Sequence, residues 1–256
     1  MGGPESRKTV RVGIYLPRDA QVLDLACVDI FGTMSYEYLS PQKDMVPAVL
    51  YNLAPSVQFF YIGKVQPGEL IPLTSGSKLM CTHHMSDPEV QPGKLDILCV
   101  PGPDPRNTWD DSSELEWLAA HAARQDTDIL CICTAIFLCG AAGILKGKKA
   151  CAPRGLQQKL KGMFEGVTWL GDSLRWNQDG NFWSCGGITN ANDLVSAYAR
   201  QSPLFPGPVA EFGLALTETG DRPQVYTTGK TVFTLGIVWQ LVKAVFLSLG
   251  KKSKTA

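Results

Sequence analysis

The sequence predicts an α/β fold in which helices cover both faces of a mostly parallel sheet. Three short runs rich in apolar or β-branched residues have the composition of buried strands: Thr9–Leu16, Leu95–Val100 and Asp128–Ile132. Segments with helical spacing of apolar residues separate these runs, as in βαβ units. At 256 residues the chain is long enough for one large domain whose core needs no disulfide or metal.

The other elements are expected in the following order. A helix over Asp24–Met34 follows the first strand, and Asp24 suits the N-cap of that helix. A second helix is expected over Ser113–Arg124, with Ser112 or Ser113 as N-cap and Glu116 near the third helical position. Further strands are expected over Val57–Ile62, Val167–Leu170 and Phe182–Cys185, and further helices over 134–143, Asn192–Gln201 and Pro208–Thr217.

The composition argues against several classes of function. The 24 basic and 24 acidic residues give no net charge, so no field favours nucleic acid as a partner. None of the eight cysteines forms a C-x-x-C pair, which indicates buried free thiols in a reducing compartment. Met1–Lys8 has no apolar signal-peptide core, so we expect a cytoplasmic protein. Without a P-loop, a G-x-G-x-x-G or an H-E-x-x-H motif, we expect no cofactor and no metal.

The C-terminal segment Thr231–Gly250 is almost continuously apolar and approaches the length of a membrane span. Gln240 and Lys243 fall near its middle, and a central lysine opposes insertion by about 2.5–3.5 kcal/mol. We therefore expect a helix that packs on the domain or on a partner subunit, with membrane association as the alternative. The predicted organisation is one domain over 9–228 and a helical extension over 229–256, which ends in a basic tail of Lys251, Lys252 and Lys254.

Cys133 is the main candidate for chemistry, because it stands between the predicted strand 128–132 and the helix that follows. Backbone N–H groups and the helix dipole at such a junction favour a thiolate, whereas the alternative is a buried thiol like Cys131. Ligands of open parallel sheets bind beyond the carboxyl ends of the strands. We expect three such segments, 16–24, 101–105 and 133–135, to bring a carboxylate, turn donors and the thiol together.

Three stretches, LDILCVPGPDP, CICTAIFLCGAAGILKGKKA and FWSCGGITNANDLVSAYA, resemble in order and spacing the DJ-1/ThiJ/PfpI superfamily of class I glutamine-amidotransferase-like proteins. The pattern is most similar to the isonitrile-hydratase-like branch of fungal type and covers residues 10 to 220. The resemblance implies a flavodoxin-like three-layer sandwich and a homodimer. It implies Cys133 as nucleophile and Asp24 as the acidic residue that faces it. It also implies Thr134 and Ala135 at the elbow positions whose N–H groups face the reacting oxygen, and Gly102 as the first glycine of a P-G-G turn.

Two departures from the family pattern limit the expected chemistry. Pro103 replaces the second glycine of the turn and has no N–H to donate. The stretch Ala150–Arg154 lacks the histidine that many members carry after the nucleophile helix. Of the three histidines, His121 fits a helix surface, whereas His83 and His84 precede a strand-ending loop and are candidates for a pocket.

The sequence therefore predicts a cofactor-independent, cysteine-dependent hydratase, lyase or isomerase that acts on a small uncharged metabolite. Cys133 attacks or moves a proton, and Asp24 is its acid–base partner. The resemblance to fungal members suggests a place in specialised metabolism. Three alternatives stay open: a redox or stress-response protein oxidised at Cys133, a glyoxalase- or deglycase-like enzyme, and a non-catalytic domain that binds a small molecule.

Overall fold

The computed structural model describes residues 7–252, with side chains described up to Leu247. The expectations for the first six residues and for the side chains of the basic tail fall outside this part of the chain. The centre is a seven-stranded sheet in the order β10-β11-β7-β6-β1-β2-β5. All neighbouring strands pair in parallel except β10 and β11. The strands are β1 Thr9–Tyr15, β2 Ser56–Gly63, β5 His83–His84, β6 Ile97–Val100, β7 Asp128–Cys131, β10 Trp176–Asp179 and β11 Phe182–Cys185.

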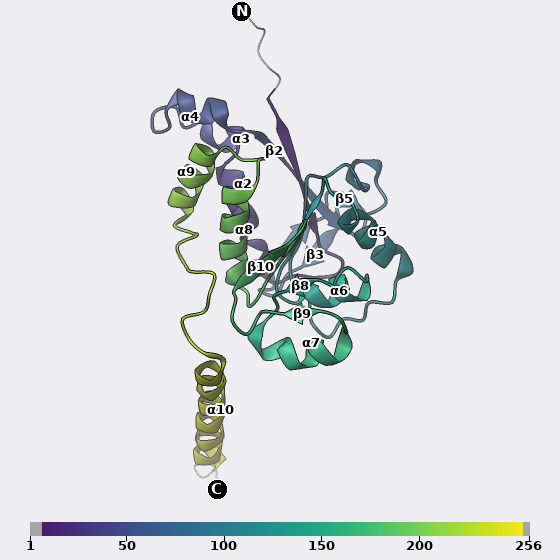
Figure 1. Ribbon diagram of the computed structural model, residues 1–256, viewed down its shortest axis with the longest axis vertical. Helices are drawn as coiled ribbons and strands as arrows, with labels where there is room; N and C mark the ends of the chain where they lie inside the picture. Colours follow the sequence, from purple (N-terminus) through teal and green to yellow (C-terminus); the bar gives the residue numbers. More distant parts are fainter. Residues whose placement is uncertain (1–6, 253–256) are drawn as a thin grey trace, which may run out of the picture.

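Helices cover both faces of this sheet, which confirms the predicted three-layer α/β sandwich (Figure 1). One face is covered by α2 Val28–Thr33, α8 Asn190–Gln201 and α9 Gly207–Thr217, and the other by α5 Ser112–Ala122 and α6 Ala135–Ala141. The fully buried strand β6 shows why continuous apolar runs are needed. Its residues Ile97 and Cys99 pack on the face that α2, α8 and α9 cover, while Leu98 and Val100 pack on the face that α5 and α6 cover.

Smaller elements connect these layers. They are α1 Val22–Leu25, α3 Tyr36–Leu39, α4 Ala48–Leu53, α7 Gln157–Met163, two 3-10 turns at Pro88–Val90 and Arg154–Leu156, and two short pairs, β3 Leu70–Pro72 with β4 Lys78–Met80 and β8 Lys149–Ala150 with β9 Thr168–Trp169.

The helix predicted over Asp24–Met34 is wrong in one respect, because the chain forms α1 and α2 there. Asp24 lies within α1 and is completely buried, so it is not the N-cap. Its N–H already bonds to the Gln21 carbonyl at 3.1 Å, and its carboxyl turns inward to the Gly102 N–H. A buried carboxyl at this position points to a role other than capping.

The start of α5 also differs from the prediction. Asp111, not Ser112 or Ser113, is the N-cap, and it accepts hydrogen bonds from the N–H groups of Ser113 and Glu114. The helix begins one residue earlier than expected, which puts Glu114 instead of Glu116 at the third helical position. A carboxylate is the stronger acceptor for these N–H groups, and a negative charge is favoured at a helix N-terminus.

His121 is fully buried in α5, so the prediction of a surface position is wrong. Its Nε2 lies 3.1 Å from the Val90 carbonyl oxygen, and its ring packs against Trp117 with 4.4 Å between the ring centroids. Burial lowers the pKa of His121 to about 4, so the ring is neutral at physiological pH. The side chain therefore acts in the core.

The apolar C-terminal helix is present as α10, Lys230–Lys252. The prediction that it packs on the domain is wrong for the described residues. The window Lys230–Leu247 is 0% buried at a mean hydropathy of 1.5, and Figure 1 shows α10 standing away from the sheet. Near its start α10 contacts the domain, where Lys230 pairs with Asp172 and the ring of Phe233 meets Arg154. Among the described helices α10 alone is long and apolar enough to cross a membrane, judged by length and composition. The boundary at 228, a partner subunit and a membrane stay predictions.

Candidate active site

Cys133 occupies a strained turn between β7 and α6. Its φ is +54°, a left-handed value that costs a residue with a side chain about 1–3 kcal/mol. Two backbone hydrogen bonds of 3.0 Å fix this turn, from Ile132 N–H to the Val100 carbonyl and from Ala135 N–H to the Ile132 carbonyl. The strain turns the thiol away from the strand direction, as in a nucleophile elbow. Cys133 is 4% exposed, so the thiol lies inside the protein.

Asp24 and Thr134 contact the Cys133 thiol, and Gly102 lies against both of these residues, so the structure brings the predicted residues together. The Gly102 N–H donates to Asp24 Oδ2 at 3.2 Å. A Cβ atom on Gly102 would lie 2.6 Å from Thr134 Oγ1 and would overlap the Asp24 carboxyl. Position 102 therefore requires glycine, because any side chain there would push the Asp24 carboxyl and the Thr134 hydroxyl away from the turn. The other carboxyl oxygen, Asp24 Oδ1, is buried and has no hydrogen-bond partner of standard geometry among the described residues.

The electrostatics of the pair are set mainly by burial. Burial raises the pKa of Asp24 to about 7, against the opposing hydrogen bonds from Cys133 and Gly102. Burial, and then the charge of Asp24, raise the pKa of Cys133 to about 12, while hydrogen bonds from Thr134 oppose this rise. Burial thus favours the neutral thiol of Cys133 and the protonated carboxyl of Asp24. The expected resting thiolate is therefore wrong. The helix that follows has only seven residues, and its N-terminus does not offset the desolvation of the sulfur.

The predicted donors differ in what they already bind. The Thr134 N–H hydrogen-bonds the Cys133 sulfur, so it faces the reacting atom. The Thr134 hydroxyl donates to the Pro103 carbonyl at 2.6 Å, which uses the acceptor that proline still has. The Ala135 N–H donates to Ile132 within the turn. Thr134 N–H is therefore the donor best placed to follow charge on a reacting group.

A second cysteine belongs to this site and was missed from the sequence. The Cys133 N–H donates a hydrogen bond to the sulfur of Cys185, which lies at the end of β11. The pairing of β11 with β7 places them together, a relationship that no local spacing reveals. The three histidines bond elsewhere: His83 to Thr82, His84 to Ser86 and His121 to Val90. The described residues thus form no cysteine–histidine dyad at Cys133.

Two cavities lie near the strand ends, and neither is lined by Cys133 or Asp24. One of about 470 Å³ is lined by Gln21 and Asp104, on either side of the Gly102 turn, and the Gln21 N–H bonds the Gly102 carbonyl at 3.1 Å. The other, of about 420 Å³, lies beyond the end of β11 at Gly187. A substrate reaches the 4% exposed thiol only if it is small or if these segments open. Residues 7–247 contain no group of three or more His, Cys, Asp or Glu side chains arranged to hold a metal ion.

The chain is similar in sequence to known proteins. The model of the DJ-1/PfpI family matches residues 35–201, a range that contains Cys133, Thr134 and Gly102 but begins after Asp24. Isonitrile hydratase of Pseudomonas putida is 31% identical over 150 residues, which are 57% of this chain and 60% of that protein. The chain thus aligns with less than two thirds of this relative.

Solved structures share the fold at low sequence identity. A ThiJ/PfpI family protein from Pseudomonas syringae has a TM-score of 0.67 at 16% identity, covering 95% of this chain and 93% of its own. An AraC family transcriptional regulator from Pseudomonas putida has a TM-score of 0.59 at 17% identity, covering 81% of this chain and 99% of its own. With the family model matched over more than half of its length, this chain belongs to the DJ-1/PfpI family.

Proposed function

We propose that this chain is a cofactor-independent, cysteine-dependent enzyme of the hydratase type, acting on a small uncharged molecule with a polarised carbon–nitrogen group. The observation that carries the proposal is the buried pair of Cys133 and Asp24, in which the carboxyl has a pKa of about 7. An acid–base group is most effective when its pKa is near the working pH. The similarity to an isonitrile hydratase supports the choice of a carbon–nitrogen substrate.

The pair can add water to an isonitrile without any other reagent. The Cys133 sulfur bonds to the terminal carbon while its proton passes through Asp24 to the same carbon, which gives a thioimidate. Water then adds to that carbon, one of its protons moves to nitrogen, and the sulfur leaves as the thiol with the other proton. The product is an N-substituted formamide, and both side chains return to their starting state. The Thr134 N–H faces the sulfur and stabilises charge that develops on it.

The surroundings favour a neutral substrate. Asp24 is completely buried, and no Lys, Arg or His lies among the groups that shift the pKa of Cys133 or of Asp24. Bringing an ionised group into such a site costs its hydration without a partner of opposite charge. A small molecule with no net charge avoids this cost. The resemblance to fungal members supports a role for the reaction in fungal specialised metabolism.

Three variants test the proposal with a small alkyl isonitrile under single-turnover conditions, with the formamide measured by mass spectrometry. Cys133→Ala is expected to abolish product, and Asp24→Asn to slow it about 10²–10⁴-fold, the usual contribution of acid–base catalysis. Cys131→Ala is the matched control and should keep the wild-type rate. It also removes a buried thiol, since Cys131 is 1% exposed and lies two residues before Cys133. Wild-type rates in both Cys133→Ala and Asp24→Asn would overturn the proposal.

The alternative of oxidation sensing is less well supported. A sensor cysteine needs an accessible thiolate, whereas Cys133 is 4% exposed and has a pKa raised to about 12. The absence of a histidine at Cys133 also weighs against glyoxalase-like chemistry that uses a cysteine–histidine pair. The likeness to the transcriptional regulator shows a shared fold and is compatible with a ligand-binding role.

A further inference from the structure

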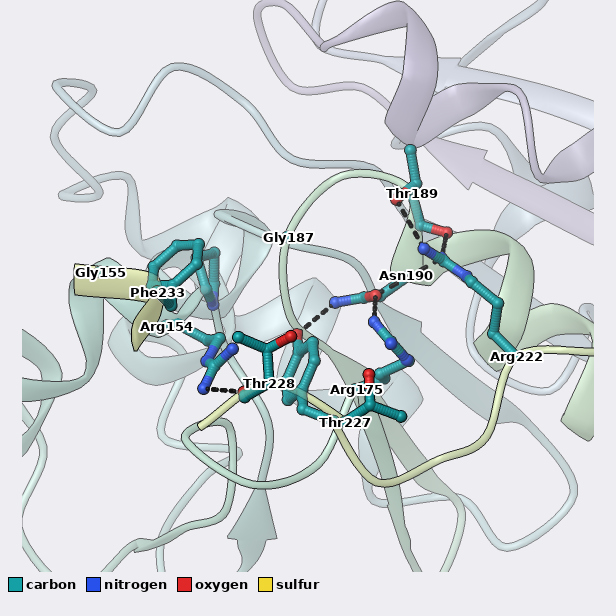
Figure 2. A pocket seen from close by; sticks show the side chains of 12 residues that line it. Arg154, Gly155, Arg175, Gly187, Thr189, Asn190, Arg222, Thr227, Thr228 and Phe233 are labelled. Carbon is teal, nitrogen blue, oxygen red and sulfur yellow. Dashed lines mark hydrogen bonds between the residues drawn. The ribbon is translucent and has the colours of Figure 1, made fainter. Parts of the chain in front are cut away.

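The cavity beyond the end of β11 is lined by three arginines and by no acidic residue. Arg154 comes from the turn after β8, Arg175 directly precedes β10, and Arg222 lies in the segment that leads to α10. Figure 2 shows these side chains around one hollow, with Phe233 of α10 beside Arg154. Segments far apart in the sequence thus place positive charge around one open pocket.

Arg154 is the most deeply placed of the three, at 9% exposure. Its guanidinium lies 4.4 Å from the ring centroid of Tyr226 and 4.9 Å from that of Phe233. Its Nη2 donates to the Thr228 carbonyl at 2.9 Å, the contact drawn in Figure 2. Its Nε is buried and has no hydrogen-bond partner among the described residues. A buried donor without an acceptor is costly, so this position calls for an acceptor that the chain itself does not supply.

Arg175 adds a second charge that no carboxylate balances by direct contact. It stacks on the same Tyr226 ring at 4.5 Å, its Nε donates to the Pro223 carbonyl at 3.0 Å and its Nη1 donates to Asn190 Oδ1 at 3.5 Å. Within the described side chains neither Arg154 nor Arg175 forms an ion pair. Arg222 is different, because Asp193 binds it through both carboxylate oxygens. Two of the three guanidinium groups therefore carry a positive charge that no carboxylate of the described residues pairs with.

We infer that this cavity binds a small organic anion, whose carboxylate or phosphate is held by Arg154 and Arg175 and whose apolar body lies against Tyr226 and Phe233. The planar guanidinium presents paired N–H donors that match the oxygens of either group. Stacking on aromatic rings fixes the orientation of both arginines before the ligand arrives. A volume of about 420 Å³ fits a metabolite-sized molecule. Neither Cys133 nor Asp24 lines this cavity, so binding of an anion here does not require the proposed hydratase reaction.

Isothermal titration of the full chain at constant ionic strength tests this site with phenyl phosphate, benzoate and inorganic phosphate. We expect saturable binding of phenyl phosphate or benzoate, and the preferred probe identifies the anionic group. Arg175→Gln is expected to weaken that binding at least tenfold. Phe233→Ala is expected to lower the affinity for the aromatic probe and to leave the affinity for inorganic phosphate unchanged.

Two controls keep the result interpretable. Arg106→Gln removes an exposed arginine that pairs with Asp104, and Cys133→Ala removes the proposed nucleophile; both are expected to bind as the wild type does. Arg175→Gln is preferred to a change at Arg154, because the buried Arg154 also supports the fold. The inference is overturned if no probe binds the wild type saturably, or if folded Arg175→Gln binds with wild-type affinity.

Discussion

Replacing Asp24 with asparagine is expected to remove a pH dependence of stability that the buried carboxyl creates. Burial raises the pKa of Asp24 from 3.8 to about 7, so between these values the folded chain keeps a proton that the unfolded chain releases. This contribution to stability is fully present below pH 3.8 and is lost as the pH rises through 7. The pKa difference of about 3 corresponds to about 4 kcal/mol, at about 1.4 kcal/mol for each pKa unit.

Urea unfolding of wild type and Asp24→Asn between pH 5 and pH 8 measures this effect. The difference between the two proteins matters, because the lowered pKa of His121 gives the wild type an opposite trend below pH 6.5. Relative to the wild type, Asp24→Asn is expected to gain about 3 kcal/mol across this range, because asparagine carries no charge to bury. Asp126→Asn is the control: Arg124 lowers the pKa of this exposed carboxyl, so it stays ionised throughout. Parallel pH profiles for wild type and Asp24→Asn would refute the reasoning.

Three further outcomes are expected. Gly102→Ala should lose isonitrile hydration and about 1–3 kcal/mol of stability, which is typical of overpacking. Gly162→Ala is the control and should lose neither, because a Cβ atom at Gly162 meets nothing within 4 Å. Equal melting temperatures for the two variants would count against the close approach at Gly102. Mild peroxide should add 32 Da to Cys133 no faster than to Cys131, as peptide mass spectrometry can show, and selective oxidation of Cys133 would favour the sensor alternative. A chain that ends at Thr228 lacks the exposed apolar surface of α10, so it should sediment as a smaller oligomer than the full chain does. If the two masses differ only by the mass of the residues removed, self-association through α10 is contradicted.

The positions of the strands and of Cys133 could be predicted because they depend on local pattern. Apolar runs such as Leu95–Val100 are buried on both faces of the sheet, and the end of such a run places the next residue at the sheet edge. The meeting of Asp24, Gly102 and Cys133 followed from the rule that ligands bind beyond the carboxyl ends of parallel strands. The motif resemblance then assigned the individual residues.

The protonation state of the pair could not be predicted in this way. A strand–helix junction indicates a stabilised thiolate, but burial, which a linear pattern does not report, has the larger effect on Cys133. Nor could the arginine cavity be found, because Arg154, Arg175 and Arg222 have no common spacing and meet only through the fold. The position of α10 also lay beyond the sequence, since its composition fits burial in a core, in a partner or in a lipid bilayer.

The two raised pKa values restrict the order of events at the thiol. Burial raises the pKa of both groups and holds the pKa of the Cys133 thiol above that of the Asp24 carboxyl, so moving the proton from sulfur to carboxyl is unfavourable before any bond to the substrate forms. A free thiolate is therefore an expensive intermediate, and attack by sulfur is favoured when proton delivery accompanies it. The carbon of an isonitrile meets this requirement, because the same atom accepts the sulfur and the proton. A carbonyl accepts them on two different atoms, and its oxygen needs a donor of its own, a position at which this chain has Pro103 without an N–H. The neutral pair and the missing donor thus both favour addition at a single carbon over amide hydrolysis.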